Sequence, residues 1–72
     1  MTSLLMIEDD DRLAGMVSDY LGASGYAVTH APDAGSGLER LQQALPELVI
    51  LDLMLPDMDG LQVCQRIRGL PG

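Results

Sequence analysis

Three acidic residues of this 72-residue chain directly follow two short apolar runs. Glu8 and Asp9 come after Leu4–Ile7, and Asp52 comes after Leu48–Leu51. If the two runs form neighbouring parallel strands, the carboxylates meet at the carboxyl edge of the sheet, where open α/β sheets bind ligands. Carboxylates that lie so close repel one another by roughly a few kcal/mol per pair at an effective dielectric constant of about 20, so we expect a cation between them.

The ion that best suits such a cluster is Mg²⁺, which prefers one or two carboxylates, bound waters and a phosphate oxygen. A zinc site is disfavoured because Cys64 and His30 are the only residues of their kinds. A bound cation would screen the charge of Asp52 against an incoming phosphoryl donor and stabilise the transition state. Asp52 is therefore the candidate nucleophile, which would accept the phosphoryl group as an acyl phosphate.

The strands that must position these carboxylates are indicated by hydrophobic patterning. Leu4–Ile7 and Leu48–Leu51 are unbroken apolar runs, which is typical of strands covered on both faces of a parallel sheet. Tyr26–His30 contains several β-formers and predicts a further short strand. We expect Asp10 or Asp11 to cap a helix between the first two strands.

Apolar residues at helical spacing predict the buried faces of three helices. In the first, the expected stripe is Leu13, Met16, Val17, Tyr20 and Leu21, and residues 22–25 end the helix. In the second, which Asp33 caps and Pro46 closes, it is Leu38, Leu41 and Leu45. The third, capped by Asp59, runs through Gly60, Leu61, Val63, Cys64 and Ile67 to Gly69. Gly35 and Gly37 each weaken the second helix by up to ~1 kcal/mol relative to alanine.

Strands and helices alternate along the chain, which predicts an α/β domain. Right-handed crossovers then give a parallel sheet with helices on both faces. Three residues are given ordinary roles: Cys64 as inert core, His30 as a surface or loop residue, and Asp57 as a turn residue.

The charge balance restricts the partners of this chain. Eleven acids against four arginines give a net charge of −7, which disfavours nucleic acid or an anionic membrane as a direct partner. The single cysteine fits a reducing compartment, and Leu4–Ile7 is too short to span a bilayer. We therefore expect a cytoplasmic protein with no membrane partner.

Two motifs resemble those of the response-regulator receiver domain. Leu4–Asp10 is similar to the first strand and acidic pair of that family, and Leu48–Gly60 is similar to its phosphoacceptor strand and loop, about 43 residues further on. The resemblance implies a flavodoxin-like doubly wound parallel sheet, here with three strand–helix units in the strand order 2-1-3. It covers residues 1–72 as the N-terminal three-fifths of a receiver domain.

The resemblance also implies roles for individual residues. Asp52 would be the phosphorylation site, and Glu8, Asp9, Asp52 and the backbone carbonyl of Met54 would hold Mg²⁺. The phosphoryl donor would be a phosphohistidine on a sensor histidine kinase. Such a receiver is self-phosphorylating and is not a turnover enzyme. The segments around Met54 and Leu61–Cys64 are similar to the OmpR/PhoB group, whose members bind DNA through a separate winged-helix domain that is absent here.

A whole receiver has two further strand–helix units, which contribute a Ser or Thr and a Lys that contact the phosphoryl group. The chain has no lysine, and no hydroxylated residue follows Asp52, so we expect its phosphorylation to be weak. In a sheet of three strands, Leu48–Leu51 would be an exposed apolar edge that favours a homodimer or a swapped dimer. The alternative function is accordingly a truncated pseudo-receiver that acts only as an interaction fragment.

Two other functions are disfavoured by single positions. Phosphotransferases of the haloacid dehalogenase type place a second Asp two positions after the nucleophile, where this chain has Met54. A calcium loop with Gly60 at its sixth position would begin at Leu55 and end at Arg66, and neither residue suits the ion.

Overall fold

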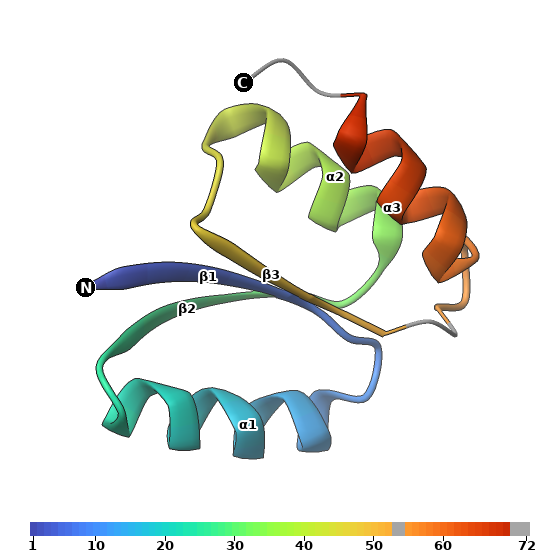
Figure 1. The fold of residues 1–72 in the computed structure, drawn as a ribbon. Helices are drawn as coiled ribbons and strands as arrows, with labels where there is room; N and C mark the ends of the chain where they lie inside the picture. Colours follow the sequence, from blue (N-terminus) through green and yellow to red (C-terminus); the bar gives the residue numbers. More distant parts are fainter. Residues whose placement is uncertain (53–54, 70–72) are drawn as a thin grey trace.

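Strands and helices alternate in the computed structural model, which describes residues 1–52 and 55–69. The elements are β1 (Thr2–Ile7), α1 (Asp11–Ala23), β2 (Tyr26–Ala31), α2 (Ala34–Gln43), β3 (Leu48–Leu51) and α3 (Gly60–Arg68), as Figure 1 shows. All six expected elements are present, and the boundaries differ from expectation by a few residues. None of the described helices has the length and apolar character needed to cross a membrane.

The three strands form one parallel sheet in the order β2-β1-β3. Leu4 pairs with Val28 on one side and with Leu48 on the other. The central position of β1 explains its unbroken apolar run, because Leu4–Ile7 is covered on both faces and is at most 3% exposed. The predicted α/β architecture and the strand order 2-1-3 are confirmed.

Helices cover both faces of the sheet: α1 lies on one face, and α2 and α3 lie on the other (Figure 1). On the α1 face, the buried residues are Leu4, Met6 and Ala14. On the opposite face they are Leu5, Ile7, Ala31, Ala34, Leu41, Leu55 and Val63. Because side chains alternate along a strand, β1 supplies both cores, and its last residue Ile7 lies in the α2–α3 core beside the carboxyl edge.

Aspartate side chains begin the three helices. Asp10 accepts the backbone N–H of Leu13 at 3.0 Å, and Asp33 accepts that of Ser36 at 2.8 Å. Asp59 caps α3 and forms a capping box with Gln62. Each carboxylate satisfies an N–H that has no partner within its helix, which fixes where the helix starts. The caps predicted at Asp33 and Asp59 are confirmed, and Asp10 rather than Asp11 caps α1.

The buried face predicted for α1 is wrong in three positions. Leu13, Met16 and Tyr20 are 44%, 63% and 72% exposed. The face that packs on the sheet is centred instead on Ala14, with Val17 and Leu21 beside it. The apolar stripe is wider than the contact with the sheet, and its exposed residues lie roughly 100° to 160° around the helix from Ala14.

Smaller corrections concern single residues outside the sheet centre. The helix α2 ends at Gln43, before Leu45 and Pro46, so Leu45 is outside the helix and 52% exposed. Leu61 lies on the outer face of α3 and is 66% exposed. Cys64 is only partly buried, so it is not a fully buried core residue.

The strand β3 lies at the edge of the described sheet and is half covered. Val49 and Leu51 pack on the core that α2 and α3 close. Leu48 and Ile50 point to the α1 face and are 48% and 37% exposed, because α1 packs mainly over β2. The expectation of an exposed apolar edge is thereby met for the alternate residues of this strand.

Candidate metal centre

The hydrogen-bond ladder of the sheet continues one residue beyond the ends of β1 and β3. The backbone N–H of Glu8 donates to the carbonyl of Ala31, and that of Asp52 donates to the carbonyl of Ile7, both at 3.0 Å. These bonds fix the backbone of both acids against the neighbouring strand. They place Glu8 and Asp52 side by side at the carboxyl edge.

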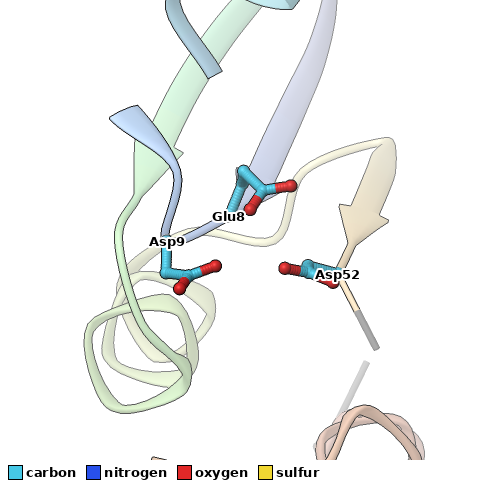
Figure 2. Close-up of side chains that lie close together, drawn as sticks. All are labelled: Glu8, Asp9 and Asp52. Carbon is cyan, nitrogen blue, oxygen red and sulfur yellow. The ribbon is translucent and has the colours of Figure 1, made fainter. Parts of the chain in front are cut away.

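Three carboxylates converge at this edge. One oxygen from each of Glu8, Asp9 and Asp52 lies within 4.8 Å of the other two, and Figure 2 shows the side chains directed toward a common space. Glu8 and Asp52 are partly buried, and Asp9 is exposed. The expected convergence of these three residues is confirmed. Asp10 and Asp11 do not join them within the described residues, because Asp10 caps α1 and Asp11 is its first residue.

The cluster is electrostatically unfavourable as it stands. The side chain of Glu8 accepts the backbone N–H of Asp10 at 3.1 Å, and this bond by itself lowers the pKa of Glu8. Burial, hydrogen bonding with the carboxyls of Asp52 and Asp9, and the charge of Asp52 together outweigh it and raise the pKa. Glu8 therefore keeps a proton to higher pH than an isolated glutamate does, because its ionised form is partly desolvated and faces other negative charges.

The donor atoms in the cluster fit a hard divalent cation. All of them are carboxylate oxygens, and they are close enough to share one ion. No histidine or cysteine belongs to the group, which disfavours zinc among the described residues. Met54, whose carbonyl was the fourth expected ligand, lies outside the described residues.

The description of His30 as a surface or loop residue is wrong. His30 is the fifth residue of β2, is partly buried, and its Nε2 lies 2.7 Å from the carbonyl oxygen of Glu8. The two residues are 22 positions apart in the sequence, so their contact depends on the pairing of β2 with β1. Sequence periodicity contains no signal for it.

Asp57 is more than a turn residue. Its two carboxylate oxygens accept the backbone N–H groups of Ala34 and Gly35, each at 2.9 Å. The loop after β3 thus closes the N-terminus of α2, next to the cap that Asp33 supplies. The hydrogen bonds from Ala34 and Gly35, in that order of importance, hold the pKa of Asp57 below its usual value.

The two hydrogen bonds that Asp57 accepts from Ala34 and Gly35 predict a contribution to stability that is lost in acid. Because its pKa in the folded chain is lowered, this contribution is complete above the ordinary pKa of 3.8 and is lost as pH falls through the lower folded value. Asp57→Asn should lower the melting temperature at neutral pH, and the difference from wild type should shrink in acid. Melting curves across pH test this, with the exposed α1 variant Asp19→Asn as the control. A difference in melting temperature that stays constant at all pH values would contradict a role for the ionised carboxylate.

Comparison with known proteins gives the family. The model of the response regulator receiver domain matches residues 4–71. The transcriptional regulatory protein AfsQ1 of Streptomyces coelicolor is 44% identical over 68 residues, which are 94% of this chain and 30% of that protein. BaeR of Escherichia coli, also a transcriptional regulatory protein, is 42% identical over 65 residues, or 90% of this chain and 27% of that protein.

Solved structures agree with the sequence relatives. A response regulator from Chloroflexus aurantiacus has a TM-score of 0.92 at 36% identity, with 97% of this chain and 57% of that chain covered. The BeF3-activated N-terminal receiver domain of RstA from Klebsiella pneumoniae has a TM-score of 0.89 at 31% identity, with 97% and 60% covered. The chain thus spans less than a third of the curated relatives' length and under two thirds of the solved receivers. On its sequence and its fold, it belongs to the family of response-regulator receiver domains.

Proposed function

We propose that this chain is a phosphoacceptor of two-component signal transduction, in which Asp52 takes a phosphoryl group from a sensor histidine kinase in the presence of Mg²⁺. The observation that carries the proposal is the approach of Glu8, Asp9 and Asp52 to within 4.8 Å of one another at the carboxyl edge. A structural role does not require three acids so close, because their mutual repulsion destabilises the fold.

In the proposed reaction, a carboxylate oxygen of Asp52 attacks the phosphorus of a phosphohistidine. An oxygen–phosphorus bond forms, the phosphorus–nitrogen bond breaks, and the imidazole of the kinase keeps the electron pair and takes up a proton. Glu8, Asp9 and Asp52, with the backbone carbonyl of Met54 as a further proposed ligand, would hold the ion. Mg²⁺, when bound, supplies positive charge that offsets the charge of the donor and of Asp52.

We also propose what kind of parent protein contains this receiver, on the basis of its relatives. AfsQ1 and BaeR are transcriptional regulatory proteins, which supports a cytoplasmic parent protein that binds DNA through a separate winged-helix domain. Residues 1–72 would then be the N-terminal three-fifths of its receiver domain. The Ser or Thr and the Lys that complete a phosphoryl site would belong to the rest of that receiver, and the whole would be a switch and not a turnover enzyme.

A magnesium titration tests the proposed site directly. Mg²⁺ should raise the melting temperature saturably and shift the backbone NMR signals of Glu8, Asp9 and Asp52, because binding stabilises the folded state. Asp9→Asn should weaken both responses by removing one ligand, whereas Asp19→Asn should leave them unchanged. A response that KCl reproduces at equal ionic strength would reject the metal site.

A pairing function is the second candidate, and the exposed β3 edge favours it. Leu48 and Ile50 present half-exposed apolar side chains on a strand at the edge of the described sheet, which is the usual template for pairing with another chain. A homodimer or swapped dimer through β3 is expected for residues 1–72. Light scattering should detect it, and Ile50→Lys should give monomers while Leu61→Lys, on α3, should not. A monomeric wild-type chain would contradict pairing. Saturable Mg²⁺ binding would favour the phosphoacceptor, because a pairing module does not require the ion.

A further inference from the structure

The backbone of Glu8 is held by β2 through both of its polar groups. Its N–H donates to the carbonyl of Ala31 at 3.0 Å, and its carbonyl oxygen lies 2.7 Å from Nε2 of His30. A carbonyl oxygen can only accept, so the imidazole is the donor and carries a proton on Nε2. Glu8 is thereby anchored at the point where β1 ends and the acidic loop begins.

The second of these bonds acts on Asp9. The carbonyl of Glu8 and the N–H of Asp9 belong to one planar peptide group, so fixing the direction of the carbonyl fixes the orientation of the whole plane. The Cα of Asp9 is the next atom along the chain. A rotation of this plane would therefore redirect the Asp9 side chain, which is the one exposed member of the acidic cluster.

We propose that His30 is a positioning residue for the metal centre: it fixes the Glu8–Asp9 peptide plane and so directs the Asp9 carboxylate toward Asp52. The inference rests on the proposed function, because it assumes that the cluster binds Mg²⁺. It adds a residue on β2, the strand that supplies no carboxylate to the group. Most other strand-forming side chains at this position would lack an N–H that reaches the carbonyl.

The experiment compares two substitutions of His30 at one fixed pH. His30→Leu removes the donor and keeps an apolar body, whereas His30→Gln places an amide N–H at about the reach of Nε2. Mg²⁺ should bind about three- to tenfold more weakly to the Leu variant, in line with the loss of one hydrogen bond, and the Gln variant should recover most of the affinity. Thr29→Val, on the neighbouring exposed position of β2, should bind as wild type does.

A measurement on the metal-free chain separates positioning from metal binding. The NMR order parameter of the Asp9 amide should fall in His30→Leu and stay near the wild-type value in His30→Gln. Equal order parameters and equal affinities in His30→Leu and wild type would overturn the inference. It would also be overturned if His30→Gln showed the same loss of affinity and order as His30→Leu. If the Leu variant does not fold, the ring nitrogen shifts of wild-type His30 decide, since an Nε2 without a proton excludes the bond.

The two proposals fail in distinguishable ways. A wild-type chain that binds Mg²⁺ no better than Asp52→Asn refutes the proposed function, whatever His30 does. In that case a drop in the Asp9 order parameter in His30→Leu would still support the positioning of the peptide, and an unchanged value would refute it.

Discussion

Asp52→Asn is expected to abolish phosphoryl transfer to this chain, whereas Asp19→Asn should leave it unchanged. Asp52 combines a carboxylate with a backbone fixed at the end of β3, by its bond to the carbonyl of Ile7, beside two other acids. An amide in its place is too weak a nucleophile to form an acyl phosphate. Asp19 lies on the exposed surface of α1 and matches the substitution in charge and size.

Acetyl phosphate with Mg²⁺ is a suitable donor, because transfer to Asp52 releases acetate and adds one phosphoryl group. The wild-type yield should be low but measurable by intact mass, because the chain has no lysine and no hydroxylated residue after Asp52. Hydroxylamine, which cleaves acyl phosphates, should remove the added mass. Modification that persists in Asp52→Asn, or stable stoichiometric modification of wild type, would contradict these expectations.

The fold of Asp52→Asn provides an internal control for this experiment. Removing one charge from the cluster relieves repulsion on Glu8, so the metal-free variant should be more stable than wild type by about 1 to 4 kcal/mol, the range for two charges about 4 Å apart between a water-like dielectric and an effective dielectric constant of about 20. If the variant shows this gain, loss of transfer cannot be attributed to unfolding. A melting curve without Mg²⁺ measures the difference.

The strands were predictable because burial on both faces leaves a plain signal in the sequence. Leu4–Ile7 reads as one apolar run, and it is the central strand, at most 3% exposed. The apolar run Leu48–Leu51 predicted the strand, but by itself it indicated cover on both faces, whereas one face is half exposed. The exposure at this edge followed only from the expected strand order. Whether an edge strand is covered depends on where the neighbouring helix packs, and the strand's own residues do not contain that information.

The carboxylate cluster was predictable for a topological reason. Parallel strands end at the same edge, so acids that follow two adjacent strands must approach one another. The contacts of His30 and Asp57 were not predictable. Each joins residues 22 or 23 positions apart, and each depends on the strand register or the path of the β3–α3 loop.

The face of α1 shows the limit of periodicity. Leu13, Met16 and Tyr20 share a helical stripe with Val17 and Leu21, and only the last two pack on the sheet. The small side chain of Ala14 lies at the centre of the contact and is 1% exposed. Hydrophobicity alone gives alanine little weight, although small residues let a helix lie close to a sheet.

Gly37 of α2 is expected to reverse the usual effect of alanine in a helix. Helix propensity alone predicts that Gly37→Ala raises the free energy of unfolding by up to ~1 kcal/mol. A Cβ at this position, however, would lie 2.5 Å from Cδ1 and 2.8 Å from Cγ1 of Ile7, a side chain with no exposed surface that cannot turn outward into solvent. We expect a net loss of about 1–3 kcal/mol in the free energy of unfolding.

Gly15→Ala, on α1, is the matched control, because a Cβ there would meet nothing within 4 Å, and it should gain stability by the propensity rule. Urea denaturation measures both variants, and equal gains would contradict the close contact between α2 and β1. Ile7→Val removes Cδ1, so combining it with Gly37→Ala should recover part of the loss, a coupling that a double-mutant cycle isolates. Since Ile7 immediately precedes Glu8, a wider α2–β1 spacing should also weaken Mg²⁺ binding, which would make Gly37 a structural requirement of the metal centre as well as of the core.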